Sequence, residues 1–146
     1  MTQEDKELLL KDLCARLPYG VKFACNKNVY TAKGLDLIVT DEGDWEYAVT
    51  AKGIAPIEID FIKPYLFPLS SMTDEQRKEL EELYLGYYVT CQDIDDDGYI
   101  WDENVFEMFP GTETDDWLNA HHFDYRGLIP KGIALDATGL NIYDYL

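Results

Sequence analysis

The sequence predicts one domain of the α+β class: an N-terminal helix, a small antiparallel β-sheet or SH3-like β-barrel, and an acidic helix–strand–helix C-terminal portion. Three observations support this prediction. A helical apolar repeat lies near the start, short alternating segments separated by turns follow it, and a helix-capping pattern opens the second half. We therefore expect a single domain over 1–146, with the helix and β unit in 1–70 and the acidic α+β portion in 71–146.

The first predicted helix spans residues 3–16. Thr2 can cap it, and acidic residues in its first turn suit the positive end of the helix dipole. Its apolar residues recur at helical spacing and form one predicted stripe: Leu10, Leu13, Cys14 and Leu17. Pro18 ends the helix, because the residue before a proline avoids the α region.

Short strands are predicted throughout residues 19–68, where apolar and polar residues alternate. The segments are 21–25, 29–31, 35–40, 45–50 and 57–62. A turn at 41–44 separates two of them, and the regular spacing is typical of a small antiparallel sheet or barrel. Pro64 and Pro68 predict that the last strand is an edge strand or leaves the sheet.

The second half opens with Thr73 and Gln76, which have the spacing of a capping box. The helix that they begin is predicted to end near residue 85, because Gly86 favours a helix end. The elements expected after it are a strand at 87–91 that pairs with 99–101, a helix over about 114–122 capped by Thr112 or Thr114, and an ordered but irregular tail over 123–146.

The chain is strongly acidic, with 12 Lys and Arg against 29 Asp and Glu, a net charge of −17. This charge disfavours binding to nucleic acid and to anionic membranes, and no stretch approaches the roughly 18 apolar residues of a membrane span. Residues 79–124 hold 14 of the acids and no Lys or Arg. We interpret this tract either as a solvated acidic face or as a surface that attracts a cationic partner.

We expect a cytoplasmic protein that uses no cofactor. The acidic start lacks the basic and apolar regions of a secretory signal. Cys14, Cys25 and Cys91 are too widely spaced for a disulfide framework or a CxxC metal site, so we predict reduced thiols in or near the core. The glycines form neither of the phosphate-binding patterns GxGxxG and GxxxxGKS/T.

One acidic segment resembles the start of a calcium-binding loop of the EF-hand type. Asp93, Asp95 and Asp97 occupy positions 1, 3 and 5, and Gly98 occupies position 6. Position 12, however, is Asn104, where that loop requires a bidentate Glu. The three aspartates are therefore candidate calcium ligands, and the alternative is an acidic hairpin turn.

Both histidines lie in the segment 117–127, which is rich in aromatic and polar residues. Adjacent histidines on a helix point about 100° apart and do not chelate one metal well. A histidine with a carboxylate or with Cys91 could serve a small hydrolase, whereas Trp and Tyr are typical anchors of a protein interface. The candidate binding residues are Trp117, Asn119, His121, His122, Asp124, Tyr125 and Arg126.

Three blocks carry a resemblance to a known family: LLLKDLCARLPYGV at 8–21, IKPYLFPLSSMT at 62–73 and DWLNAHHFDYRGLI at 116–129. The chain resembles a family of small uncharacterised proteins of gut Bacteroides-type bacteria and of their phages and prophages. The resemblance implies a mobile-element context and a bacterial cytoplasm. The resemblance does not identify any functional residue in this chain.

The first functional hypothesis is a non-enzymatic binding or accessory protein of phage or prophage origin, with an unidentified protein partner and the 116–129 block as its docking surface. The second is an acidic mimic of nucleic acid that occupies a host DNA-binding protein through the 79–124 tract. The third is a small hydrolase that uses His121 or His122.

Overall fold

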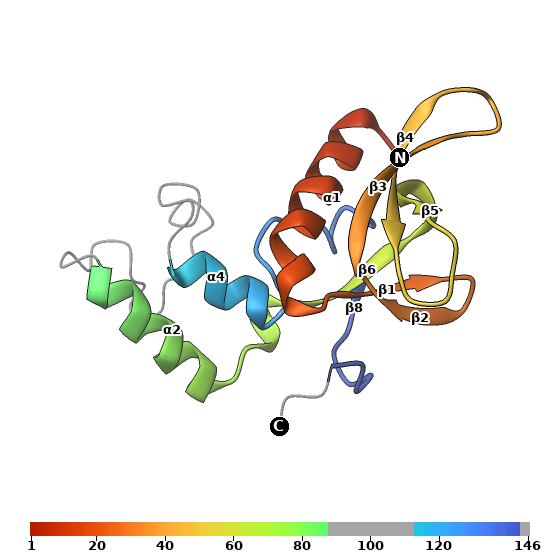
Figure 1. Ribbon diagram of the computed structural model, residues 1–146. Helices are drawn as coiled ribbons and strands as arrows, with labels where there is room; N and C mark the ends of the chain where they lie inside the picture. Colours follow the sequence, from red (N-terminus) through yellow and green to blue (C-terminus); the bar gives the residue numbers. More distant parts are fainter. Residues whose placement is uncertain (88–112, 144–146) are drawn as a thin grey trace.

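The computed structural model describes residues 1–87 and 113–143, and Figure 1 shows how their helices and strands are arranged. The predicted α+β class is confirmed. The helices and strands are α1 (Gln3–Arg16), β1 (Lys22–Cys25), β2 (Asn28–Thr31), β3 (Gly34–Val39), β4 (Trp45–Thr50), β5 (Ile57–Glu58), β6 (Lys63–Pro68), α2 (Asp74–Tyr87), α4 (Glu113–Ala120), β7 (Phe123–Asp124) and β8 (Leu135–Asp136).

The strands form two separate sheets and do not close into a barrel, so the SH3-like expectation is wrong. In one sheet β2, β1, β6 and β7 are bonded in that order, with β8 also on β6, while β3, β4 and β5 form the other. The predicted strand 57–62 is broken by a 3-10 turn at Ile59–Phe61. Ile59 turns into the core there, and the chain passes from the second sheet back to the first.

β5, which begins the predicted strand 57–62, is the edge strand of its sheet, and the chain leaves that sheet after it, as predicted. β6, which the sequence does not predict as a strand, is an interior strand. The Phe67 N–H donates to the His122 carbonyl of β7's entry turn, and the Leu66 carbonyl accepts from the Ala137 N–H next to β8, each at 2.8 Å. Adjacent residues of a strand direct their backbone groups to opposite edges, so β7 and β8 flank β6. Both run parallel to β6, which makes this sheet mixed rather than antiparallel.

The two prolines of β6 are tolerated because they lie near its ends. Pro64 is opposite Phe23 of β1, and Pro68 is the last residue of the strand, opposite Asp124. A proline removes one N–H from the ladder, and the loss is smallest where pairing begins or stops. The hydrogen bonds that hold β7 and β8 come from the residues between the prolines.

α1 begins as predicted, but its buried face matches the predicted stripe only in part: Leu13 is buried and Leu17 packs against the core, whereas Cys14 is exposed. The Thr2 hydroxyl accepts from the Asp5 N–H at 3.1 Å and caps the helix. The buried side chains of the helix are Leu9, Asp12, Leu13 and Arg16. Apolar periodicity could not find the whole of this face, because two of its four members are charged.

The two described cysteines lie in different environments. Cys14 is exposed, which corrects the expectation of a thiol in or near the core, because the buried face of α1 passes through Leu13 and leaves the next residue in solvent. Cys25 is buried at the end of β1, as predicted. Cys91 lies outside the described residues.

α2 opens with the predicted capping box. The Thr73 hydroxyl accepts from the Gln76 N–H at 3.2 Å, and the Gln76 side-chain oxygen accepts from the Thr73 N–H at 2.9 Å. The helix continues to Tyr87, past the end predicted near residue 85, and therefore includes Gly86. The remainder of the predicted strand 87–91 and its hairpin partner 99–101 lie outside the described residues.

α4 begins and ends earlier than the predicted helix 114–122. It starts at Glu113, so Thr114 is not its cap, and Thr112 lies outside the described residues. It ends at Ala120, because His122 adopts a left-handed backbone with a φ of 59° that turns the chain into β7. The tail after it contains the short strands β7 and β8 among irregular turns.

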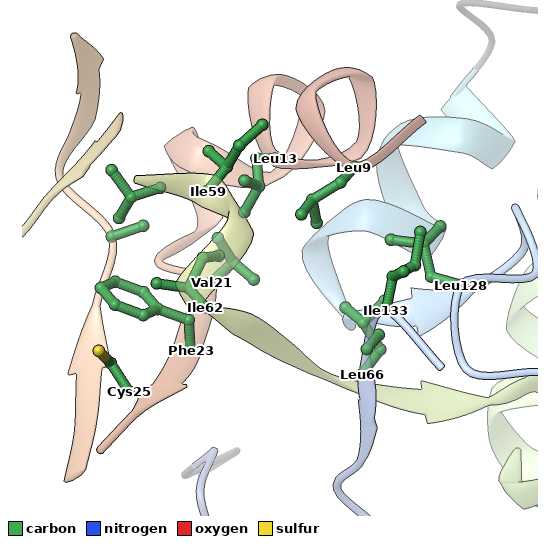
Figure 2. Close-up of a cluster of buried hydrophobic side chains, with 13 residues drawn as sticks. Leu9, Leu13, Val21, Phe23, Cys25, Ile59, Ile62, Leu66, Leu128 and Ile133 are labelled. Carbon is green, nitrogen blue, oxygen red and sulfur yellow. The ribbon is translucent and has the colours of Figure 1, made fainter. Parts of the chain in front are cut away.

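Two hydrophobic clusters hold these elements together. The larger one, drawn in Figure 2, joins α1, the strands and the C-terminal segment, with Leu9, Phe23, Leu66 and Leu128 fully buried in it. The smaller cluster joins α2 and α4 through Met72, Leu80, Trp117, Leu118 and Phe123. The main core therefore includes side chains from both sides of residue 70.

A buried carboxylate connects α1 to the C-terminal segment. Asp12 Oδ2 accepts from Arg16 Nε at 2.9 Å, and Asp12 Oδ1 accepts from Arg126 Nη1 at 2.8 Å. The side chains of Asp12 and Arg16 are fully buried, and Arg16 Nη2 also donates to the Phe123 carbonyl. Because an uncompensated buried charge is costly, these contacts hold α1 against residues 123–126.

We predict that Asp12→Ala lowers the free energy of unfolding by about 3–5 kcal/mol, because it leaves the buried Arg16 guanidinium without its carboxylate. Urea denaturation measures the change. Glu46→Ala is the matched control: Glu46 binds Lys6 at 2.8 Å, close to the 2.9 Å between Asp12 and Arg16, but this pair is partly exposed, so its loss costs about 1 kcal/mol or less. Equal destabilisation by the two variants would contradict the prediction.

Candidate functional site

The seven binding residues predicted from the sequence gather where α4 passes into β7, and most of them are interior. Trp117, Asn119, His122 and Asp124 are buried. The other three, His121, Tyr125 and Arg126, are half-buried. The Asp124 carboxylate accepts from the N–H groups of Leu128 and Ile129, at 2.9 and 2.8 Å, and so closes the turn that follows β7.

The contacts of this group lie within the protein. Trp117 Nε1 donates to Glu79 Oε1 at 2.8 Å and ties α4 to α2, and the His121 ring stacks on the indole with centroids 4.0 Å apart. The Tyr125 hydroxyl donates to Asn119 Oδ1 at 3.1 Å. The Arg126 guanidinium lies over the Tyr125 ring, 4.4 Å from its centroid.

A partner could reach the buried members of this group only by displacing packed side chains. Binding through the 116–129 block therefore stays a prediction. In the free chain its residues join α4, α2 and α1.

His122 is a buried titratable group with a strongly lowered pKa. Its ring stacks on Tyr143 with centroids 3.9 Å apart. Burial, together with the nearby positive charge of Arg16, lowers the pKa of His122 from 6.5 to about 3. The ring is therefore neutral at pH 7. The Tyr143 hydroxyl accepts from the Lys22 N–H and donates to the Tyr65 carbonyl, and burial raises its pKa.

The candidate calcium ligands Asp93, Asp95 and Asp97 lie outside the described residues, as does much of the acidic tract 79–124. Calcium binding therefore stays a prediction. Within residues 1–87 and 113–143, no group of three or more His, Cys, Asp or Glu side chains could hold a metal ion. No helix of that part of the chain has the length and apolar character needed to cross a membrane.

Four large apolar side chains are exposed together on the hairpin that β3 and β4 form. Leu37 pairs with Tyr47 across the strands and Val39 pairs with Trp45, so all four lie on one face. We call these four residues the hairpin face. Their exposed fractions are 50% for Leu37, 55% for Val39, 70% for Trp45 and 42% for Tyr47. A contiguous exposed apolar patch is typical of an interaction site.

The hairpin face is the outer end of a surface that is buried at its base. The next pair inward is Leu35 with Val49; Val49 is fully buried in the main core and Leu35 packs against it. Figure 1 shows the turn between β3 and β4 projecting beyond the rest of the molecule. The same apolar face is thus covered where the hairpin meets the core and uncovered where it extends past it.

The turn that joins the two strands is well defined by hydrogen bonds. The Thr40 carbonyl accepts from the Gly43 N–H at 2.9 Å, and the Thr40 N–H donates to the Asp44 carbonyl at 2.8 Å. Gly43 has a φ of 87°, as the left-handed position of such a hairpin loop requires. The turn therefore holds the strands in register and keeps the hairpin face preorganised.

The hairpin face is not among the sites predicted from the sequence, although the sequence contains a signal for it. Apolar residues occupy every second position over both 35–39 and 45–49, which predicts one wholly apolar face. Period-two alternation shows that a face is apolar, but it does not show how far the covering core extends. The positions of α1 and of the first sheet determine how much of this apolar face the core covers.

Comparison of the chain with protein-family models, with curated proteins and with solved structures finds no match. The resemblance carried by the three sequence blocks therefore stays a prediction. The geometry of the described residues is the basis of the proposals below.

We predict that His122 makes the protein less stable in acid. The unfolded chain binds the imidazole proton with a pKa near 6.5, whereas the folded chain binds it only near 3. The contribution of His122 to the free energy of unfolding is therefore fully present above pH 6.5, and it is lost progressively as the pH falls toward 3. Between pH 7 and pH 5 this group alone costs about 2 kcal/mol.

Urea denaturation of His122→Asn at several pH values tests this, because Asn also tolerates the left-handed backbone. In this variant the free energy of unfolding should fall less between pH 7 and pH 5, by about the contribution of His122, even if the substitution also changes the stability at pH 7. Leu140→Thr, which removes no titratable group, is the control and should keep the slope of the wild-type protein. An unchanged slope in His122→Asn would show that His122 is not the cause.

Proposed function

We propose that this chain is a non-enzymatic binding protein that docks onto another protein through the hairpin face. The observation that supports this proposal is the shared exposure of Leu37, Val39, Trp45 and Tyr47. Burying one such side chain fully is worth roughly 1.5–3 kcal/mol, so a partner that covers the face gains a substantial driving force. Trp and Tyr are also among the residues that dominate binding energy at interfaces.

The regular hydrogen bonding of the hairpin supports the same proposal. Binding is weakened by the free energy spent on ordering loops and side chains. Here the turn over 40–44 is closed by backbone hydrogen bonds, and the strands are paired along 34–39 and 45–50. A partner therefore meets a surface whose backbone is already ordered.

The other hypotheses remain predictions on which this proposal does not depend. A phage or prophage origin rests on the three sequence blocks. The nucleic-acid mimic needs the carboxylates of 79–124 along one ridge, whereas Glu79 and Asp124 bond within the protein. The hydrolase needs a reactive histidine, whereas His121 and His122 both stack on aromatic rings.

We predict that Leu37→Thr with Trp45→Thr weakens binding to a cellular protein by about ten-fold or more, because it removes the apolar centre of the hairpin face. The immobilised chain retains candidate partners from a bacterial lysate. Each retained protein is then purified, and its Kd is measured against the wild-type chain and the variant. Threonine suits a strand, so the urea midpoint should change little.

Leu140→Thr is the matched control, since Leu140 is also exposed but lies outside the hairpin. This variant should bind each partner as tightly as the wild-type chain. Equal affinity of all three chains, or no retained protein at all, would contradict the proposal. A wild-type dimer that becomes monomeric in the double variant would also contradict it, because the hairpin face would then serve self-association.

A further inference from the structure

We propose that the partner presents a basic amphipathic segment, whose apolar side chains cover the hairpin face and whose Lys or Arg side chains meet the acids beside it. This inference rests on the proposed function and names the chemistry of the partner. It follows from the charges of the hairpin and from the state of its strand edges.

The hairpin is uniformly acidic. Between Lys33 and Lys52 the chain holds no Lys or Arg, and it holds five acids: Asp36, Asp41, Glu42, Asp44 and Glu46. Lys6 of α1 forms an ion pair with Glu46 at 2.8 Å. Among the ion pairs of the described residues, none involves the three exposed acids of the turn, at 41, 42 and 44.

These turn acids lie directly beside the apolar side chains. Val39 and Trp45 are the pair nearest the turn, and the acids at 41–44 lie between them along the chain. The site therefore combines an aromatic and aliphatic centre with a charged rim, which is the usual anatomy of a protein interface. Rim charges steer association with an oppositely charged partner, while the apolar centre sets how slowly the complex dissociates.

The same charges disfavour other occupants of the face. A second copy would bring a chain of net charge −17 against another of the same charge. An anionic membrane and a nucleic acid would be repelled for the same reason. A basic protein segment is the occupant that both the apolar centre and the acidic rim attract.

Strand addition at the hairpin edges is also disfavoured. The Leu37 N–H donates to Asp36 Oδ1 at 2.9 Å, and the Tyr47 N–H donates to Glu46 Oε1 at 3.0 Å. An added strand would need such N–H groups for its own ladder, and carboxylates on the edge are a common protection against that pairing. The partner is therefore expected to pack on the face rather than to extend the sheet.

Two synthetic helical peptides of about 18 residues, or about five turns, test the inference. They share one apolar stripe of Leu and Trp and differ only in a polar face of Lys or of Glu. Anisotropy of the labelled peptides, titrated with the full chain at about 0.05 and about 0.3 M salt, gives each Kd. The Lys peptide should bind about ten-fold more tightly or better, and its affinity should fall with salt.

Three variants locate the binding. Asp41→Asn with Glu42→Gln and Asp44→Asn should weaken the Lys peptide several-fold at low salt and flatten the salt dependence. The double variant Leu37→Thr with Trp45→Thr should weaken it at both salt concentrations, and Leu140→Thr should leave it unchanged. Lys-peptide binding that is unaffected by the double variant would overturn the inference, because charge attraction elsewhere would then explain it.

Failure of this inference is distinguishable from failure of the proposed function. If a purified cellular partner requires Leu37 and Trp45 but the Lys and Glu peptides bind equally, the hairpin face is a docking site and the basic chemistry is wrong. If the double variant changes neither peptide binding nor partner binding, both are wrong.

Discussion

Two guanidinium groups from opposite ends of the chain converge on the carboxylate of Asp12, which has no access to water. Arg16 comes from the same helix, and Arg126 comes from the segment that follows β7. A buried carboxylate of this kind needs its partners in place, so the packing of α1 and the position of residues 123–126 depend on each other. Arg16 adds a bond to the Phe123 carbonyl, which fixes the start of β7 as well.

The position of β7 determines much of the remaining fold. With β7 on one edge of β6 and β8 on the other, β6 becomes the interior strand of the larger sheet. The main core then fills the space between this sheet, α1 and the turn at 59–61, and on the β3–β4 side it reaches the Leu35–Val49 pair. The hairpin of β3 and β4 extends beyond the side chains of this core. Its outer residues therefore keep an apolar face that no described element covers.

The molecule thus places several residues contrary to their usual preference, and these placements are informative about function. Asp12, Arg16, His122 and Asp124 are inside, where they bond or stack with neighbours and join elements. Leu37, Val39, Trp45 and Tyr47 are outside, on a hairpin of paired strands. The buried polar residues account for stability and for its dependence on pH. The exposed apolar residues form the surface proposed to bind a partner.

The sequence by itself determined the features that depend on a few neighbouring residues. The caps at Thr2 and Thr73, the turn that needs Gly43 and the strand over 45–50 are all local, and the structure contains each of them. Only the tertiary structure decided that Asp12 is buried, that β6 is interior and that the hairpin face is bare. Asp12 and Arg126 are 114 residues apart, and Phe67 of β6 pairs with Phe123 of β7, 56 residues further along the chain. Local patterns carry no information about which distant segments meet, so they cannot show which apolar face the core leaves uncovered.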